Sequence, residues 1–280
     1  MTSGSLNEIW LKATPLTHLI RPELGSTLVR VGSSLDGGYL ISAELNTSAM
    51  NLISLGYGFN SDFEREFAKK PGTRVLLVDD VSNWIFYFKT MYTQILKHNV
   101  KMFIQGQFLN IAFKNWLNPI NDWLKLRTNS KIKYINKRVV KFPASKEEVS
   151  FENLLGEYLS DQVDNMVKID IEGSEYEILF DLLQHEDSVC GGIIEFHEIS
   201  NHDAFFIDYM PLFRKFFRID HVHVNNFRQP VNRTISTIEV SFTSRKLFPS
   251  DKIELAKLSK HDLDFPNTDQ QPSIFLDFID

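Results

Sequence analysis

Charged side chains interrupt an apolar run in VKIDIEGSEYEIL, residues 167–179. With the two-residue period of a β-strand, Lys168, Asp170 and Glu172 project from one face. Burying carboxylates inside a strand is costly unless they have partners. We therefore expect this strand to end at the ligand-binding edge of a sheet, where its acids take part in binding or proton transfer. The alternative is a structural ion pair within this group.

A glycine turn, Gly56-Tyr57-Gly58, follows another apolar segment. Ser61 and Glu64 have the spacing of a capping box, which predicts a helix soon after the turn. Free amides at such a turn suit the close approach of a polar or anionic cofactor. The turn is therefore predicted to form one wall of a cofactor site.

Two acidic residues, Asp79 and Asp80, end the next apolar segment, RVLLVD at 74–79. Their separation from the glycine turn is typical of an acid that accepts hydrogen bonds from a ribose. The sequence therefore indicates a cofactor that contains a nucleoside. The alternative is a solvated turn.

Ionisable side chains also end two later segments. Glu195 and His197 project the same way from IIEFHEIS, as His221 and His223 do from DHVHVNN. If both segments belong to the same sheet, these side chains gather near Asp170 at one edge. Imidazoles beside carboxylates favour acid–base chemistry or metal binding. The alternative is that each histidine is a hydrogen-bonded structural group.

Composition limits the class of protein. The chain has 280 residues, of which 43% are hydrophobic, so it can bury a sizeable core. A formal net charge of −6 disfavours general nucleic-acid binding and leaves a small-molecule or glycan partner. Cys190 is the only cysteine, which excludes an internal disulfide and favours a reducing compartment. Because the sequence lacks a long apolar run and a signal-peptide pattern, we expect a cytoplasmic protein without a membrane span.

Short apolar segments alternate with helix-like stretches from residue 50 onward, which predicts an α/β fold with a largely parallel sheet. The segments are 50–55, 74–79, 132–137, 166–171, 191–196, 217–224 and 236–242. Only a polar loop separates the last two segments. They are therefore predicted to pair antiparallel, with the last strand reversed.

Three regions of the single predicted domain lie outside this alternation. Residues 1–48 are an N-terminal extension with a hairpin over 28–42, and residues 245–280 are a C-terminal extension. Residues 81–130 are too long for one crossover and are interpreted as a helical cap insertion rich in aromatic side chains. These aromatics would pack within the insertion, form a contact in a homo-oligomer, or bind the acceptor.

The run VKIDIEGSEYEIL resembles the FkbM family of S-adenosylmethionine-dependent methyltransferases, whose hallmark is K-x-D-x-E-G-x-E-x-x-x-L. RVGSSLDGGYLI, SLGYGFNSDFE, EFHEI and HVHVNN are similar to a subgroup that carries an R-x-G…D-G-G-Y element. The resemblance spans residues 28 to 245. It implies the class I methyltransferase fold, a Rossmann-like seven-stranded sheet with a reversed last strand, and S-adenosyl-L-methionine as the cofactor.

The resemblance also implies roles for residues of the predicted cofactor site. Gly56, Tyr57 and Gly58 would approach the methionine part of the cofactor, Asp79 or Asp80 would hold the ribose, and Asp170 would lie by the amino end or the acceptor. Ser54 stands where the family often has an aspartate. Compensating contacts would then come from Asp36, Gly38, Tyr39 and Glu64.

Methyl transfer is an in-line displacement that requires an acceptor oxygen about 3 Å from the methyl carbon. A hydroxyl is a poor nucleophile until its proton leaves, so we expect a base beside it. His197 and His223 are the candidate bases, and Glu172 or Glu195 would orient the imidazole or take the proton. A variant uses a divalent ion such as Mg²⁺ or Mn²⁺. Its candidate ligands are Asp170, Glu172, Glu195, His197, His221 and His223.

The resemblance implies O-methylation of a sugar, a nucleotide sugar or a glycan-related metabolite, as in polysaccharide biosynthesis. Two other functions remain open: an NAD-dependent oxidoreductase, and a non-catalytic Rossmann-like binding module. Ser61 replaces the third glycine of the dinucleotide-binding motif, and a reversed final pair is not expected there. A non-catalytic module has no reason to keep ionisable groups on a shared crevice.

Overall fold

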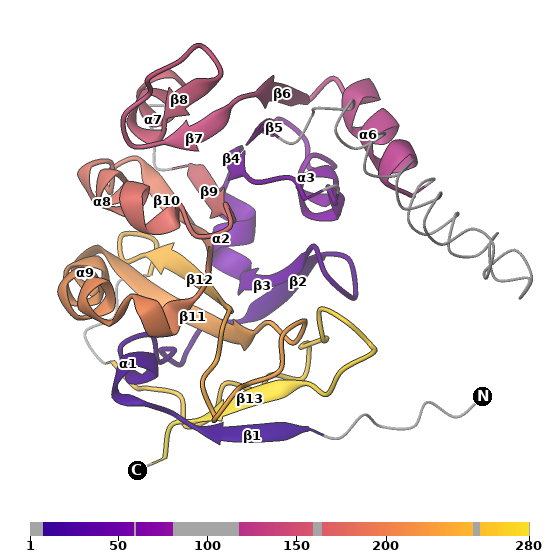
Figure 1. Cartoon of the computed structure of the whole chain (residues 1–280). Coiled ribbons are helices and arrows are strands. Elements are labelled where there is room, and N and C mark those ends of the chain that lie inside the picture. The colour runs from indigo at the N-terminus through magenta and orange to yellow at the C-terminus, as the bar shows by residue number, and fades with distance from the viewer. Residues whose placement is uncertain (1–7, 59, 81–117, 159–163, 249–252, 280) are drawn as a thin grey trace, which may run out of the picture.

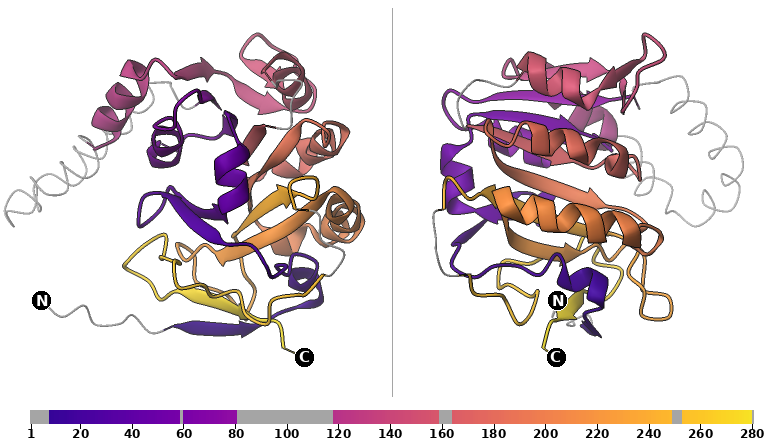
Figure 2. Two further views of the ribbon diagram at one scale, coloured as in Figure 1. Left: turned by 180° about the vertical axis from the view of Figure 1, so that it is seen from behind. Right: turned by 90° about the vertical axis from the view of Figure 1, so that its left-hand side faces the viewer.

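The computed structural model describes residues 8–58, 60–80, 118–158, 164–248 and 253–279. Within them, nine strands form one mixed sheet in the order β1-β13-β11-β12-β10-β9-β4-β5-β6 (Figure 1). The sheet is the middle layer of the molecule, with helices on both of its faces (Figure 2). The predicted α/β fold is confirmed.

Five neighbouring strands of the sheet run parallel to one another. They are β4 (Asn51–Leu55), β5 (Arg74–Asp79), β6 (Ile132–Asn136), β9 (Asn165–Ile169) and β10 (Val189–Phe196). Each of them overlaps a predicted segment, although β9 ends two residues before the predicted end at 171. Every residue of β9 and β10 is buried, as expected for parallel strands that are covered on both faces.

The remaining strands include the predicted reversal. β12 (Ile238–Ser244) is antiparallel to both β10 and β11 (Phe217–Val224), so the predicted reversal of the last of the seven predicted strands is confirmed. β13 (Ile274–Asp277) pairs with β11, and β1 (Ile9–Lys12) pairs with β13. Both terminal segments that the sequence analysis treats as extensions therefore contribute a strand to the sheet.

Helices on one face of the sheet are α1 (Pro15–His18), α7 (Phe151–Tyr158), α8 (Glu175–Gln184) and α9 (Asp203–Phe216) (Figure 1). The short strands β7 (Arg138–Val140) and β8 (Glu148–Ser150) pair beside α7, and η2 (Ile199–Asn201) precedes α9. The other face carries α2 (Ala43–Ser48) and α3 (Asp62–Phe67). None of the helices in the described residues is long and apolar enough to cross a membrane.

The hairpin of β2 (Leu28–Gly32) and β3 (Gly38–Ser42) is confirmed and packs against β11 and β12. Ser42 Oγ lies 2.8 Å from Thr243 Oγ1, a hydrogen bond between the hairpin and β12. His221 and Ser241 are paired neighbours on β11 and β12, and both face the hairpin rather than solvent. The hairpin therefore shields the polar side of the last two predicted strands, which is where several predicted site residues lie.

Much of the predicted helical insertion at 81–130 falls on residues 81–117, which lie outside the described residues. Its described end is α6 (Asn118–Thr128). In α6, Trp123 packs against the apolar core beneath the hairpin, and Arg127 lies over its ring, 5.2 Å from the centroid. This aromatic residue thus packs within the fold itself.

Helix α3 begins as predicted after Ser61, but it is not opened by a capping box. The Ser61 backbone N–H and hydroxyl both donate to Asp122 of α6, at 3.0 and 2.8 Å. Glu64 instead accepts a hydrogen bond from Ser54 at 2.5 Å. The predicted capping box is wrong because tertiary partners take both of its side chains.

A buried ion cluster attaches the N-terminal segment to the sheet. Glu23 is 5% exposed and accepts hydrogen bonds from Arg214 at 2.9 Å and from Arg245 at 2.7 Å. Arg214 belongs to α9, and Arg245 follows β12, so one carboxylate connects three segments far apart in sequence. Removal of one partner from such a cluster leaves uncompensated buried charge.

We predict that Glu23→Ala lowers the free energy of unfolding by about 3–5 kcal/mol, because two guanidinium groups lose their counterion. Lys12→Ala is the control, since Lys12 is 64% exposed in its ion pair with Asp277 and such pairs contribute at most about 1 kcal/mol. Urea denaturation of both variants measures the difference. Equal losses in the two variants would contradict this role for Glu23.

Candidate functional site

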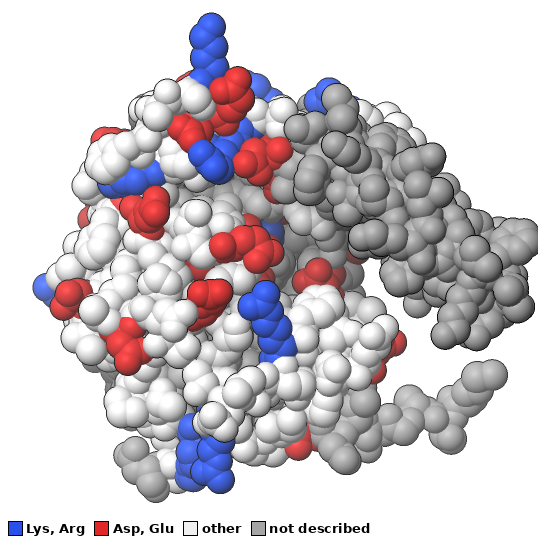
Figure 3. Space-filling model, viewed as in Figure 1, with Lys and Arg blue, Asp and Glu red and all other residues white. Residues whose placement is uncertain are grey.

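A cleft of about 230 Å³ lies where three neighbouring parallel strands end. Its walls include Gly56 and Gly58 after β4, Asp79 and Asp80 at the end of β5, and Asp170 and Glu172 after β9. All six of these residues belong to the predicted site. On the face shown in Figure 3, acidic side chains gather around a hollow in the middle of the molecule. The cleft is at the edge where open parallel sheets bind ligands.

The glycine turn after β4 depends on a close backbone approach. Gly56 has φ +89°, and a Cβ on it would lie 1.7 Å from the carbonyl oxygen of Asp170. Gly58 has φ +53° and open space where a Cβ would stand. The first glycine therefore lets the ends of β4 and β9 meet, and the second leaves room at the cleft.

The two aspartates at the end of β5 differ in environment. Asp79 is 8% exposed, and its carboxylate accepts a hydrogen bond from the Tyr57 backbone N–H at 2.5 Å. The Tyr57 hydroxyl donates to Asp122 at 2.8 Å, which directs the side chain away from the cleft. Asp80 is exposed. Asp79 thus holds the glycine turn in place, while Asp80 lines the same cleft at its solvent side.

Beside the cleft lies a group that we call the His197 corner: Asp170, Glu172, Glu195 and His197. Nε2 of His197 faces three carboxylate oxygens, at 3.6 Å from Glu172, 3.7 Å from Glu195 and 3.9 Å from Asp170. β9 ends at Ile169, so Glu172 lies in a turn with φ 52° rather than on a strand face. The predicted gathering of these four residues is found.

Glu175, in the first turn of α8, orients His197 and was missed by the sequence analysis. It is fully buried, and one of its carboxylate oxygens accepts the His197 backbone N–H at 2.7 Å and lies 3.3 Å from Nδ1. Its other oxygen accepts the Gly173 N–H at 2.8 Å. Helix periodicity could have indicated it, because Glu175 is a charged residue on the apolar helix face that carries Ile178 and Leu182.

The pKa of His197 reflects opposing effects. Burial alone would lower it, but the hydrogen bond with Glu175 and the charges of Glu175, Asp170 and Glu172 raise it overall. The pKa of Glu195 is raised well above its usual value, first by burial and then by the charges of Asp170 and Glu239. The corner therefore favours proton uptake at both groups.

Lys168 supplies positive charge behind the corner. It is 4% exposed, and its Nζ lies 3.2 Å from the Gly56 carbonyl oxygen, 3.3 Å from Asp170 and 3.9 Å from Glu64. Burial lowers the pKa of Lys168, but the charges of Asp170 and Glu64 outweigh this and raise it. Glu64 is 1% exposed and lies beneath the turn, not among the residues that line the cleft.

The predicted hairpin residues lie near Lys168 and Asp170 but outside the lining of the cleft. Tyr39 is buried, with its ring centroid 5.7 Å from Lys168 Nζ. The pKa of Asp36 is raised by burial and then by the charge of Asp170. Gly38 cannot carry a Cβ, because it would lie 1.9 Å from the Ser33 carbonyl oxygen. These residues shape the interior next to Asp170 and do not line the cleft.

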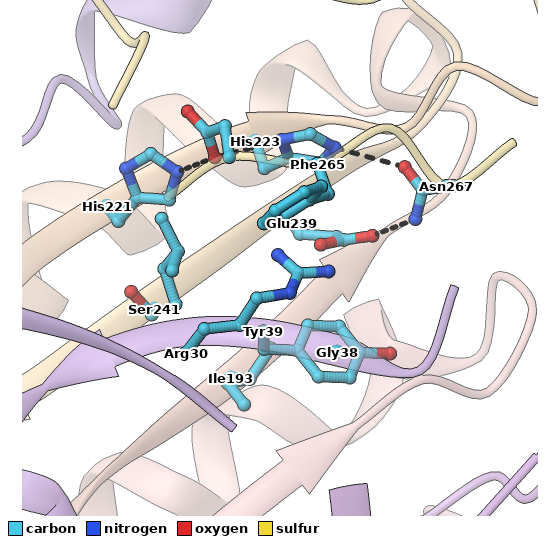
Figure 4. A pocket seen from close by; sticks show the side chains of 12 residues that line it. Arg30, Gly38, Tyr39, Ile193, His221, His223, Glu239, Ser241, Phe265 and Asn267 are labelled. Atoms are coloured by element: carbon cyan, nitrogen blue, oxygen red, sulfur yellow. Dashed lines mark hydrogen bonds and ion pairs between the residues drawn. The ribbon is translucent and has the colours of Figure 1, made fainter. Parts of the chain in front are cut away.

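His221 and His223 belong to a second cluster, which is drawn in Figure 4. Asp264 Oδ1 lies 2.8 Å from His221 Nε2 and 3.3 Å from His223 Nδ1. Asn267 connects His223, at 3.1 Å, with Glu239, at 2.6 Å. The sequence analysis missed Asp264 and Asn267, which lie in a segment without strand or helix periodicity and offered no signal.

This second cluster is closely packed. The cavity that it borders with Arg30 and Tyr39 holds about 10 Å³, roughly the space of one water molecule. The charges of His221 and His223 and their hydrogen bonds outweigh burial and hold the pKa of Asp264 far below its usual value. The structure thus separates His197 from His221 and His223. His197 lies beside Asp170 and Glu172, which line the cleft, whereas His221 and His223 border the small cavity with Arg30 and Tyr39.

We predict that Asp264→Asn lowers the free energy of unfolding by about 2–3 kcal/mol at pH 6 and by clearly less at pH 9. Asp264 and Asn267 raise the pKa of His223 against the effect of burial. A raised folded-state pKa stabilises the fold below the unfolded value of about 6.5, and this contribution is lost as the pH rises through the folded value. Denaturant titrations of wild type and Asp264→Asn at both pH values measure the loss in the free energy of unfolding.

Asp277→Asn is the control, because Lys12, the partner of this half-buried aspartate, stays charged at both pH values. Its effect should be the same at pH 6 and pH 9. A loss in Asp264→Asn that does not change with pH would mean that the imidazole charge contributes nothing.

No protein-family model matches the chain, and no curated protein matches it in sequence. Similar solved structures include a putative rRNA methylase from Clostridium thermocellum, with 11% identity, coverage of 71% of this chain and 92% of that chain, and a TM-score of 0.37. A human methyltransferase 10 domain containing protein has 10% identity, 70% and 72% coverage and a TM-score of 0.38. A precorrin-6y C5,15-methyltransferase from Geobacter metallireducens has 11% identity, 72% and 85% coverage and a TM-score of 0.34. The fold assignment rests on the strand order, and these similarities add no argument about activity.

Proposed function

We propose that the chain is an S-adenosylmethionine-dependent O-methyltransferase of the FkbM family, whose hallmark run it resembles. The observation that carries the proposal is the cleft at the ends of β4, β5 and β9, with a glycine turn on one wall and Asp79 and Asp80 on another. This is the edge at which nucleoside cofactors bind in open parallel sheets. The reversed β12 supports a methyltransferase over an NAD-dependent oxidoreductase.

The residues of the cleft fit such a cofactor. The positive φ and open surroundings of Gly58 leave space beside the turn, and Asp80 offers an exposed carboxylate to ribose hydroxyls. Asp170 lies where the cleft meets the His197 corner, on the side proposed for the methionine end. When bound, the cofactor supplies an electrophilic methyl group on a sulfonium.

The acceptor hydroxyl would lie between the cleft and the His197 corner, because Asp170 and Glu172 belong to both. These residues would hold its oxygen on the transfer axis. The corner would take its proton on Nε2 of His197, or on a carboxylate if a bound cation acidifies the hydroxyl. His223 is less suited to act as the base, since Asp264 and Asn267 engage both of its ring nitrogens.

A sugar, a nucleotide sugar or a glycan-related metabolite is the proposed acceptor class. The excess of carboxylates around the cleft disfavours a nucleic-acid phosphate backbone and suits a polyhydroxyl compound, whose hydroxyls donate to carboxylates. We place the enzyme in the cytoplasm. Cys190 supports this location, because its thiol is buried and burial raises its pKa to about 12, so it is not available for a disulfide.

Calorimetry with the full chain tests the cofactor. We predict binding of S-adenosylhomocysteine and none of NAD. In Gly56→Ala the affinity should fall at least about tenfold, a loss of about 1.4 kcal/mol, because the added Cβ forces β4 and β9 apart. Gly156→Ala in α7 is the matched control, since nothing lies within 4 Å of its added Cβ. NAD binding without a response to S-adenosylhomocysteine would overturn the proposed function.

The role of the His197 corner is tested by methyl transfer from S-adenosylmethionine to an acceptor found by screening sugars and nucleotide sugars. We predict that His197→Asn lowers the rate about hundredfold or more, the usual contribution of a proton-transfer group, while S-adenosylhomocysteine affinity is kept. His223→Asn should retain activity in its folded fraction. If His197→Asn were as active as the wild type, the corner would have no part in the reaction.

A further inference from the structure

The geometry at His197 differs from that of a hydrogen-bonded histidine. The distances from Nε2 to Glu172, Glu195 and Asp170 are 3.6, 3.7 and 3.9 Å, beyond the 2.7–3.2 Å of an N–H···O hydrogen bond. One ligand atom each of Asp170, Glu172 and His197 lies within 4.8 Å of the others. Atoms at this mutual distance can all contact one ion at 2.0–2.4 Å.

The ring of His197 is held as metal-binding imidazoles are held. Nδ1 lies 3.3 Å from a buried oxygen of Glu175, which also accepts the His197 backbone N–H. A carboxylate on one ring nitrogen orients the lone pair of the other toward a metal in most histidine sites. Here that other nitrogen, Nε2, points at the carboxylates of the corner.

The carboxylates of the corner are oriented as well. Asn225 donates to Glu195 at 2.9 Å, and Lys168 donates to Asp170 Oδ2 at 3.3 Å, which leaves Asp170 Oδ1 directed at His197. Lys168 is shared with Glu64 behind the turn. Among the described residues, Lys168 therefore forms ion pairs with both Asp170 and Glu64. Its single positive charge is smaller than the summed negative charge of the nearby carboxylates, so the corner keeps an excess of negative charge.

The corner is also open to a ligand. Asp170 and Glu172 line the cleft of about 230 Å³, so water or an acceptor oxygen can reach an ion there. The cluster of His221, His223 and Asp264 differs, because Asp264 lies at hydrogen-bond distance from His221 and only a cavity of about 10 Å³ borders it. The two clusters thus have different chemistry.

We propose that Asp170, Glu172 and His197, with Glu195 beside them, form a divalent metal site that borders the cofactor cleft. Mixed carboxylate and imidazole ligands suit Mn²⁺ and related first-row ions, with Mg²⁺ as an alternative. The proposal that an ion binds here depends only on this geometry. The proposal that the ion acidifies the acceptor hydroxyl rests in addition on the proposed function. In that role His197 is a ligand of the ion, and the proton of the acidified hydroxyl passes to a carboxylate of the corner.

Mn²⁺ titration of the full chain, followed by electron paramagnetic resonance, tests the site. We expect one ion per chain, with a ¹⁴N coupling from imidazole that is lost in His197→Gln. Glu172→Gln should weaken binding at least tenfold without a folding defect, because this side chain is 86% exposed. Glu175→Gln should weaken it ten- to a hundredfold through the orientation of His197.

Glu198→Gln is the matched control. Glu198 follows His197 directly and is exposed, but its carboxylate accepts from Asn201 instead of facing Nε2. Its Mn²⁺ affinity should equal that of the wild type. Absence of bound Mn²⁺, or equal affinity in wild type and Glu172→Gln, would overturn the metal site.

Calorimetry of the metal-free chain with S-adenosylhomocysteine separates this proposal from the proposed function. If S-adenosylhomocysteine binds and Mn²⁺ does not, only the metal site fails. If Mn²⁺ binds with the ¹⁴N coupling and S-adenosylhomocysteine does not, the metal site stands and the methyltransferase assignment fails.

Discussion

A buried ammonium group organises the functional edge of this protein. Lys168 Nζ contacts the Gly56 carbonyl oxygen, Asp170 and Glu64 at 3.2–3.9 Å, and the residue is 4% exposed. An isolated buried charge costs several kcal/mol, so these partners must stay in place. The ammonium therefore links the turn after β4, the end of β9 and helix α3. Because the same turn and strand end form the walls of the cleft, its shape depends on this one buried charge.

The carboxylates around Lys168 outnumber its one positive charge, and the remaining carboxylates are stabilised in different ways. Glu195 has a raised pKa and accepts from Asn225, whereas Glu239 accepts from Asn267. At His197, the fully buried Glu175 fixes the ring, and three further carboxylates stand too far away for hydrogen bonds. This arrangement raises the pKa of Glu195 and of His197 and so favours proton uptake at this edge.

The sheet was largely predictable from sequence, because strands buried on both faces must be continuously apolar. The gathering of Asp170, Glu172, Glu195 and His197 was predictable too, since the carboxyl ends of parallel strands meet at one edge. The contributions of Glu175 and Asp264 were not. Glu175 lies 22 positions before its partner His197, and Asp264 lies 43 positions after His221, in a segment without periodicity. Helix spacing marks Glu175 as a charge on an apolar face, but no local pattern identifies the distant residue that such a side chain contacts.

The sequence by itself determined seven of the nine strands, the reversed final pair and the acids and imidazoles near the strand ends, because these follow from local apolar runs and a two-residue period. Only the tertiary structure decided which histidine lies beside the acids of the cleft. His197 and His223 look alike in sequence, but the C-terminal segment places Asp264 and Asn267 against His223, whereas α8 places Glu175 behind His197 and leaves Nε2 facing the acids. The two imidazoles therefore differ in chemistry because of neighbours that arrive from distant parts of the chain.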